Sequence, residues 1–188
     1  MKNLLNLLLF LSIPLSASSI IYTSSYIDVI NENVLKNSSI TVDDGIITSI
    51  DSGYIKVKQT DTLIDLRGKT LMPGLMDMHV HFGGEYQSKA QRPIKTERET
   101  EAILATLHAS VTLKAGFTTV RQVGDSGLVA ISLRDAINAG HVIGPRIFTS
   151  GKSIATTGGH ADPTNGMSSD SYEYPVPEDG VINGPYEA

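Results

Sequence analysis

The sequence predicts an α/β protein in which a small β domain precedes a domain of alternating strands and helices. Two observations predict this division. Residues 20–71 consist of short β-rich runs separated by turn-forming residues, whereas residues 75–149 alternate between apolar strand-like runs and helical runs. The composition agrees with a folded protein, because hydrophobic residues make up 40% and charged residues 19% of the 188 residues.

Residues 1–18 have the layout of a secretory signal peptide. Lys2 provides a positive start, an apolar run follows from Leu4 to Leu15, and the small residues at 16–19 suit a cleavage site. The apolar run is too short to span roughly 30 Å of hydrocarbon. We therefore expect export to the periplasm or the medium, without stable insertion in a membrane.

Composition also excludes some kinds of chemistry and partner. The chain has no cysteine, which excludes a thiolate metal site and a cysteine nucleophile. Any chemistry must therefore use histidines, carboxylates or hydroxyl groups. The net charge of -5 gives no indication of nucleic acid as a partner.

Residues 19–72 are expected to form a small antiparallel sheet, part of a β-sandwich-type domain completed by strands elsewhere. Asp44-Gly45 between two β-rich runs predicts a hairpin turn. The remaining runs with strand character continue the same pattern toward the turn at 67–69, and they lie at 27–30, 54–57 and 62–66.

From residue 73 onward the pattern predicts strand, helix, strand, helix, strand, which is typical of a parallel α/β fold. We expect strands at 75–81, 117–123 and 147–149. Thr96 and Glu99 form a capping box at the start of the first helix, and Gly116 stands where its C-terminal cap belongs. A complete (β/α)8 barrel needs about 250 residues, so residues 73–188 would form only its first part.

His79 and His81 are the candidate metal ligands. Side chains alternate along a strand, so both imidazoles project from one face and can bind one metal ion. Met76, Met78 and Val80 would then pack under the helices on the other face. An isolated H-x-H pair is most often a polar strand face, but the apolar strand and its Pro73-Gly74 entry favour a metal site here.

The segment at 73–81, PGLMDMHVH, resembles the first-strand motif of the amidohydrolase superfamily. Residues 44–50 and 65–69 resemble the N-terminal β domain of that family, and residues 115–121 resemble its second barrel strand. The segments at 144–147 and 157–160 are similar to the branch that contains imidazolonepropionase-like enzymes and Xaa-Pro dipeptidases. The resemblance implies an N-terminal fragment of a TIM-like (β/α)8 barrel enzyme.

The resemblance also implies a function, the metal-dependent hydrolysis of a C–N amide bond in Xaa-Pro dipeptides or N-acyl amino acids. His79 and His81 would bind one or two divalent ions, usually zinc, while further ligands and an aspartate general base are expected beyond residue 188. His160 resembles a substrate-contacting residue of that branch, with an exposed loop histidine as the alternative. A homo-oligomer is compatible with this interpretation.

Two other functions stay open. The first is a cyclic amide hydrolase resembling imidazolonepropionase, against which predicted export argues modestly. The second is a catalytically incomplete remnant or binding module, because a catalytic zinc usually has three protein ligands plus water and this chain offers two. We therefore expect the 188-residue chain alone to be inactive. Arg121 is expected to form a buried salt bridge, and Gln122 receives no role because the family often has an acidic residue there.

Overall fold

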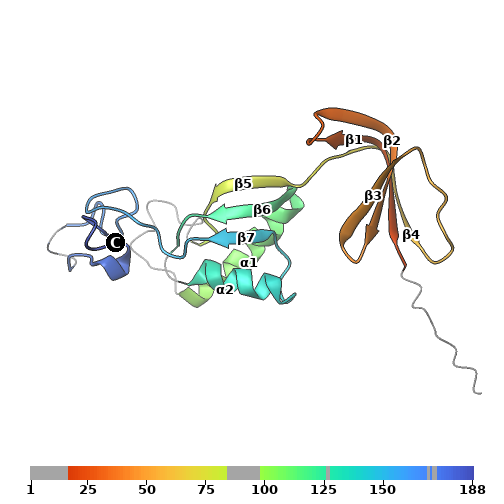
Figure 1. The fold of residues 1–188 in the computed structure, drawn as a ribbon. Helices are drawn as coiled ribbons and strands as arrows, with labels where there is room; N and C mark the ends of the chain where they lie inside the picture. Colours follow the sequence, from red (N-terminus) through yellow and green to blue (C-terminus); the bar gives the residue numbers. More distant parts are fainter. Residues whose placement is uncertain (1–16, 84–97, 126–127, 169, 171–172) are drawn as a thin grey trace, which may run out of the picture. The chain divides into compact units, whose positions relative to one another are not determined.

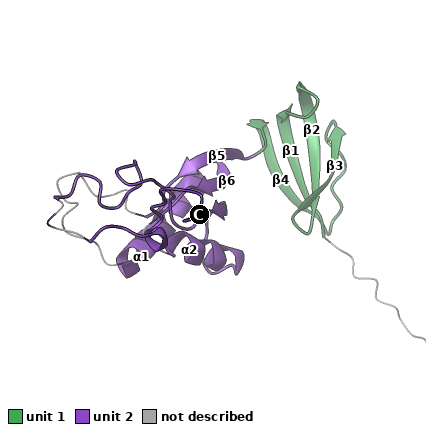
Figure 2. Ribbon diagram, turned by 60° about the vertical axis from the view of Figure 1, so that its left-hand side comes forward, with its two compact units in different colours: residues 1–73 green, residues 74–188 purple. Residues whose placement is uncertain are grey.

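The computed structural model describes residues 17–83, 98–125, 128–168, 170 and 173–188 (Figure 1). All but the last two residues of the predicted signal peptide, as well as Thr96 of the predicted capping box, lie outside the described residues. The chain divides into two compact units, Met1–Pro73 and Gly74–Ala188 (Figure 2). Within the part of the chain that is described, no helix is long and apolar enough to cross a membrane.

The first unit is a four-stranded mixed sheet. Its strands β1 (Ser19–Asp28), β2 (Asn33–Asp43), β3 (Ile46–Ser52) and β4 (Thr62–Leu71) lie in the order β3-β2-β1-β4. The predicted hairpin between β2 and β3 is confirmed, and Asp44 and Gly45 both have the left-handed conformation that such a two-residue turn requires.

The expectation of a purely antiparallel sheet is wrong for the last strand. β1 pairs with β2 in antiparallel fashion but with β4 in parallel fashion. The reason is the connection after β3, which returns the chain to the opposite edge of the sheet, so that β4 runs alongside β1 in the same direction.

The predicted strand at 54–57 is also wrong, because side chains take the place of a neighbouring strand there. Ser39 Oγ donates to the Gly53 carbonyl oxygen at 2.7 Å and accepts from the Ile55 amide at 3.0 Å. The Tyr22 hydroxyl donates to the Ile55 carbonyl oxygen. Both backbone groups of Ile55 are therefore satisfied without a sheet ladder.

The second unit is a three-stranded parallel sheet with two helices, as the alternation of patterns predicts. β5 (Leu75–Val80), β6 (Phe117–Gln122) and β7 (Arg146–Thr149) lie in the order β5-β6-β7, connected through α1 (Arg98–Lys114) and α2 (Val129–Asn138) (Figure 1). The C-terminal segment forms a short 3₁₀ helix, Pro177–Asp179, where the sequence predicts only loop. A single bridge between Ala155 and Val181 ties this segment back to the chain that leaves β7.

The core of the second unit lies between the helices and the strands β6 and β7. Buried apolar side chains from both helices and both strands form it, namely Ala105, Ala109, Val120, Val129, Leu133 and Ile147. Small alanines on α1 allow a close approach to the sheet.

Val80 packs against the buried core as predicted, but the prediction that Met76 and Met78 pack under the helices is wrong. They are 67% and 66% exposed, because β5 is an edge strand and the helices cover β6 and β7 instead. The apolar residues Ile103, Leu107 and Val111, which repeat at helical spacing along α1, are likewise largely exposed. The strand expected at 75–81 is present as Leu75–Val80, and most of its side chains are exposed.

Candidate metal centre

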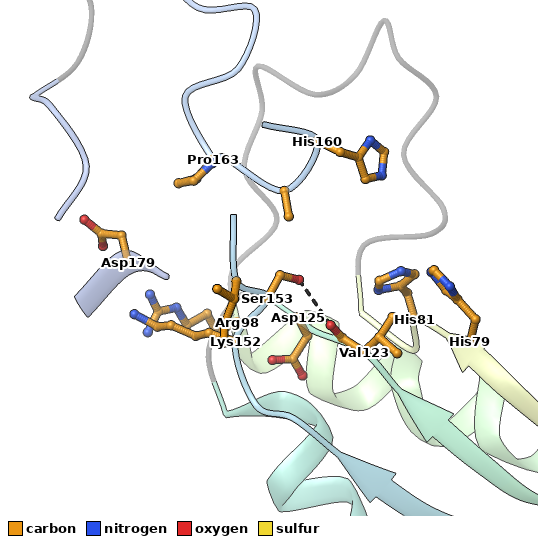
Figure 3. Close-up of a pocket in the computed structure, with 12 residues that line it drawn as sticks. His79, His81, Arg98, Val123, Asp125, Lys152, Ser153, His160, Pro163 and Asp179 are labelled. Carbon is orange, nitrogen blue, oxygen red and sulfur yellow. Dashed lines mark hydrogen bonds between the residues drawn. The ribbon is translucent and has the colours of Figure 1, made fainter. Parts of the chain in front are cut away.

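His79 and His81 stand at the carboxyl end of β5, where the parallel strands of the sheet end together. His79 is the penultimate residue of the strand, and His81 is the first residue after the strand ends. Their ring centroids are 5.3 Å apart and their ring planes are inclined at 68°. Asp77 shapes this end of the strand, because its carboxylate accepts the His79 amide at 3.0 Å. The two imidazoles therefore lie side by side, as the strand alternation predicts (Figure 3).

Both histidines line a cavity of about 640 Å³ within the second unit. Its other lining residues come from the start of α1, the loop after β6 and the chain that follows β7, and they are Arg98, Val123, Asp125, Lys152, Ser153, Ile154, His160, Ala161, Pro163 and Asp179 (Figure 3). In such folds, ligands bind outside the carboxyl ends of the strands. The cavity is therefore at the position where a binding site is expected.

His81 is held in one orientation by the loop after β6, residues 123–125, which we call the β6 loop. The His81 Nδ1 atom lies 2.8 Å from the Gly124 carbonyl oxygen. A carbonyl oxygen only accepts, so Nδ1 carries the proton and donates. In the neutral form of this tautomer the Nε2 atom has a free electron pair. This is the atom with which such an imidazole binds a metal ion.

The sequence prediction missed Gln122, the last residue of β6. Its side chain is fully buried, accepts from the Phe82 amide at 3.0 Å and donates to the Gly124 carbonyl oxygen at 3.1 Å. Its position at the end of a strand was the available signal, because it pairs with Val80, between His79 and His81, at the end of β5. Asp125 also lies at this strand end, where its carboxylate accepts from the Ala130 amide in the first turn of α2.

His160 lies across the cavity from His79 and His81, in a loop at 157–164 that we call the His160 loop (Figure 3). Asp162 closes this loop. It is only 6% exposed and accepts from the Gly158 amide at 2.7 Å and from the Thr164 amide and hydroxyl at 2.8 and 2.7 Å. The Thr164 hydroxyl first, and then the two amides, hold the pKa of the Asp162 carboxyl below its usual value.

The far wall of the cavity carries two cationic side chains. Arg98 lies at the start of α1, and Lys152 lies after β7, near Asp179 (Figure 3). The Lys152 ammonium group also donates to the Glu178 carbonyl oxygen in the C-terminal segment. The cavity therefore has imidazoles on one side and two cationic side chains together with the Asp179 carboxylate on another.

Two further predictions concern the number of metal ligands and a buried salt bridge of Arg121. No group of three or more His, Cys, Asp or Glu side chains that could hold a metal ion occurs among the described residues. His79 and His81 thus form a pair rather than a complete site within that part of the chain. Arg121 forms no ion pair with any described carboxylate, so the expected buried salt bridge is absent there.

The chain is similar to known proteins both in sequence and in structure. Residues 70–184 match the Amidohydrolase family. A Xaa-Pro dipeptidase solved with methionine bound in its active site is 64% identical, with a TM-score of 0.85 over 91% of this chain and 42% of that one. A prolidase solved in complex with N-methylphosphonate-L-proline is 26% identical, with a TM-score of 0.73 over 89% of this chain and 41% of that one.

A curated relative is more distant. Ochratoxinase of Aspergillus niger is 28% identical over 136 residues, which cover 68% of this chain and 27% of that protein. The chain thus spans about a quarter of the length of this relative and less than half of the two solved structures.

Proposed function

Because this chain belongs to the amidohydrolase family, we propose that the protein containing it hydrolyses C–N amide bonds with the help of a divalent metal ion. Dipeptides of the Xaa-Pro type or N-acyl amino acids are the proposed substrates. The observation that carries the proposal is the pair of imidazoles, His79 and His81, side by side at the mouth of a cavity. The 64% identity to a Xaa-Pro dipeptidase supports the choice of dipeptides.

The residues present fit a metal ion of the zinc type. Neutral imidazole is a preferred ligand for zinc, and the bond from Nδ1 to the Gly124 carbonyl oxygen makes Nε2 the ligand atom of neutral His81. We propose that His79 and His81 supply two ligands for one or two ions. Further ligands and the general base would come from outside the described residues. A bound ion of this kind supplies Lewis-acid chemistry, activating water and polarising a carbonyl group.

The protein side chains have separate tasks in this proposal. His81 is oriented by the β6 loop, so its ligand atom is fixed before an ion arrives. His160, across the cavity, donates to a carbonyl or carboxylate oxygen of the substrate. Arg98 and Lys152 provide a positive wall that attracts the carboxylate of a dipeptide.

We also propose an architecture and a cellular location for the protein that contains this chain. We propose that β5, β6 and β7 with their helices are the first part of a (β/α)8 barrel at residues 73–188. Residues 19–72 would then belong to an accompanying β-sandwich-type domain, and residues 1–18 would direct export to the periplasm or the medium. The partial match to larger amidohydrolase structures supports the first of these proposals.

The test is hydrolysis of Met-Pro, Ala-Pro and N-acetyl-methionine by the protein containing this chain. We expect turnover that stops after treatment with a chelator and returns when zinc is added. The His160→Ala variant should raise KM for dipeptides while zinc still restores turnover. Hydrolysis that continues unchanged after complete removal of metal would contradict the proposal.

A second candidate is a binding module without hydrolytic activity. Such a module would hold an ion with the two imidazoles of His79 and His81 without activating water, since a catalytic zinc usually has three protein ligands. In that case zinc and dipeptides would bind without any product being formed. The same assay, combined with calorimetric binding of Met-Pro, separates the two functions.

A further inference from the structure

Two side chains of the second unit, those of His81 and Gln122, meet at one carbonyl group, that of Gly124. The His81 ring donates to it from the end of β5 at 2.8 Å, and the Gln122 side-chain amide donates to it at 3.1 Å. A carbonyl oxygen has two electron pairs and can accept both donors at once. The direction of this carbonyl therefore depends on both partners.

The other end of the Gln122 side chain is equally fixed. Its Oε1 atom accepts from the Phe82 amide at 3.0 Å, and the Phe82 carbonyl oxygen lies 2.9 Å from His108 Nδ1 on α1. The amide of Gln122 can satisfy a donor at one end and an acceptor at the other in only one orientation. Gln122 thus joins Phe82, the residue after His81, to Gly124, the residue that orients His81.

The β6 loop is also confined from its other side. Gly124 has a φ of 146°, and a Cβ atom there would lie 1.8 Å from Ser153 Oγ and 2.7 Å from the Ser153 nitrogen. Gly124 therefore packs directly against the chain that follows β7. The loop therefore cannot shift toward that chain when its bond to Gln122 is lost.

We propose that Gln122 is a positioning residue for the metal site, which sets the ring orientation and tautomer of His81 through the Gly124 carbonyl. The inference rests on the proposed function, because it assigns Gln122 a role toward an ion bound by His79 and His81. Gln122 is fully buried and touches neither the ion nor the substrate in this account. Its effect passes through two hydrogen bonds.

The test compares Gln122→Met with Val120→Ala in the protein containing this chain. Methionine keeps the length and volume of glutamine but makes neither hydrogen bond. Val120 is fully buried two residues earlier on the same strand and touches the core instead. Both variants should lower the melting temperature, so stability alone does not distinguish them.

Two readouts distinguish a positioning role from a structural one. Zinc affinity is measured by competition with a chromophoric chelator, and the His81 tautomer of the metal-free protein is measured by nitrogen-15 NMR. We expect Gln122→Met to weaken zinc binding about tenfold or more and to mix the two His81 tautomers. Val120→Ala should leave zinc affinity within about twofold and keep the Nδ1–H tautomer.

The opposite result would overturn the inference, namely a Gln122→Met protein with the zinc affinity and tautomer of Val120→Ala. Should Gln122→Met fail to fold, Gln122→Asn takes its place, because it keeps the amide but is too short to reach both partners. A wild-type protein that binds no zinc contradicts the proposed function instead, whereas equal zinc binding by wild type and Gln122→Met contradicts only this inference.

Discussion

The β6 loop and the His160 loop face each other across the cavity but are stabilised in different ways. Gly124 in the β6 loop is bonded to His81, 43 positions away, and the adjacent Gln122 is bonded to Phe82, 40 positions away. The His160 loop is closed by Asp162, whose partners Gly158 and Thr164 lie within four positions. The first loop is therefore held by the strand ends of the sheet, whereas the second is closed mainly by its own residues, with one long-range bond from the Thr157 amide to Asn183 Oδ1 at 3.0 Å.

We therefore expect the two loops to have different tasks, one in metal binding and the other in substrate binding. Metal ligands need positions that hold to a fraction of an ångström, and long-range bonds between strand ends provide them. A substrate contact can sit on a locally closed turn, which keeps its shape while its position adjusts to the ligand. Changes in the β6 loop should therefore affect metal affinity, and changes in the His160 loop should affect substrate binding.

Among the variants of the two loops, the largest effect is expected for Gly124→Ala. The added methyl group would overlap Ser153 Oγ and the Ser153 backbone, and the residue would retain a φ of 146° that alanine rarely adopts. We expect a loss of about 1–3 kcal/mol in the free energy of unfolding and a zinc affinity lowered about tenfold or more. Chemical denaturation and chelator competition measure the two quantities.

Gly158→Ala in the His160 loop is the matched control. Gly158 also has a positive φ, of 71°, but nothing lies within 4 Å of an added Cβ atom. We expect a cost of about 1–2 kcal/mol from the backbone conformation alone, with unchanged zinc affinity. Equal losses of zinc affinity in the two variants would contradict the different tasks proposed for the two loops.

A moderate effect is expected for Asp162→Ala, which removes the acceptor of three hydrogen bonds in the His160 loop. The loop should lose its closed shape, so KM for a Xaa-Pro dipeptide should rise about tenfold, corresponding to one or two lost hydrogen bonds. Zinc affinity should not change. Thr164→Val removes only the hydroxyl donor and should raise KM less, and an unchanged KM in both variants would remove His160 from the substrate site.

The smallest effect concerns pH. The folded-state pKa of Asp162 lies below its usual value of 3.8, so the ionised form stabilises the His160 loop. This stabilisation is complete above the unfolded-state pKa and is lost as the pH falls through the folded-state pKa. Hydrogen exchange of the Gly158 and Thr164 amides should therefore speed up relative to intrinsic rates below pH 3.8.

The β6 loop provides the internal control for this pH dependence. The Phe82 amide donates to Gln122, which does not titrate, so its protection should not follow the Asp162 titration. In an Asp162→Asn variant the acid-dependent step at Gly158 and Thr164 should disappear. A Phe82 amide that loses protection together with them would indicate that the two loops open as one unit.

The sequence predicted those parts of the molecule that follow from local pattern. Strand alternation placed His79 and His81 on one side, and Asp44-Gly45 marked a true hairpin. The direction of β4 could not be predicted, because it depends on where an irregular connection leads. The exposure of Met76 could not be predicted either, since it depends on which strands the helices cover.

Gln122 escaped prediction for a related reason. A buried glutamine is explained only by its partners, and both are backbone groups at the ends of two different strands. Their direction follows from the register of β5 against β6, which includes irregularities that no sequence pattern reveals. By contrast, the role of Asp162 within its loop uses partners two and four residues away, which a search for side-chain-closed turns would find.

The central claim is that His79 and His81 together bind a divalent metal ion. The most direct measurement is zinc affinity, by chelator competition, for His79→Ala, His81→Ala and the control His141→Ala, which changes an exposed histidine outside the cavity. We predict that the first two variants lose about 100-fold or more in affinity, whereas the control binds zinc as the wild type does. Wild-type zinc affinity in His79→Ala and His81→Ala would contradict the claim.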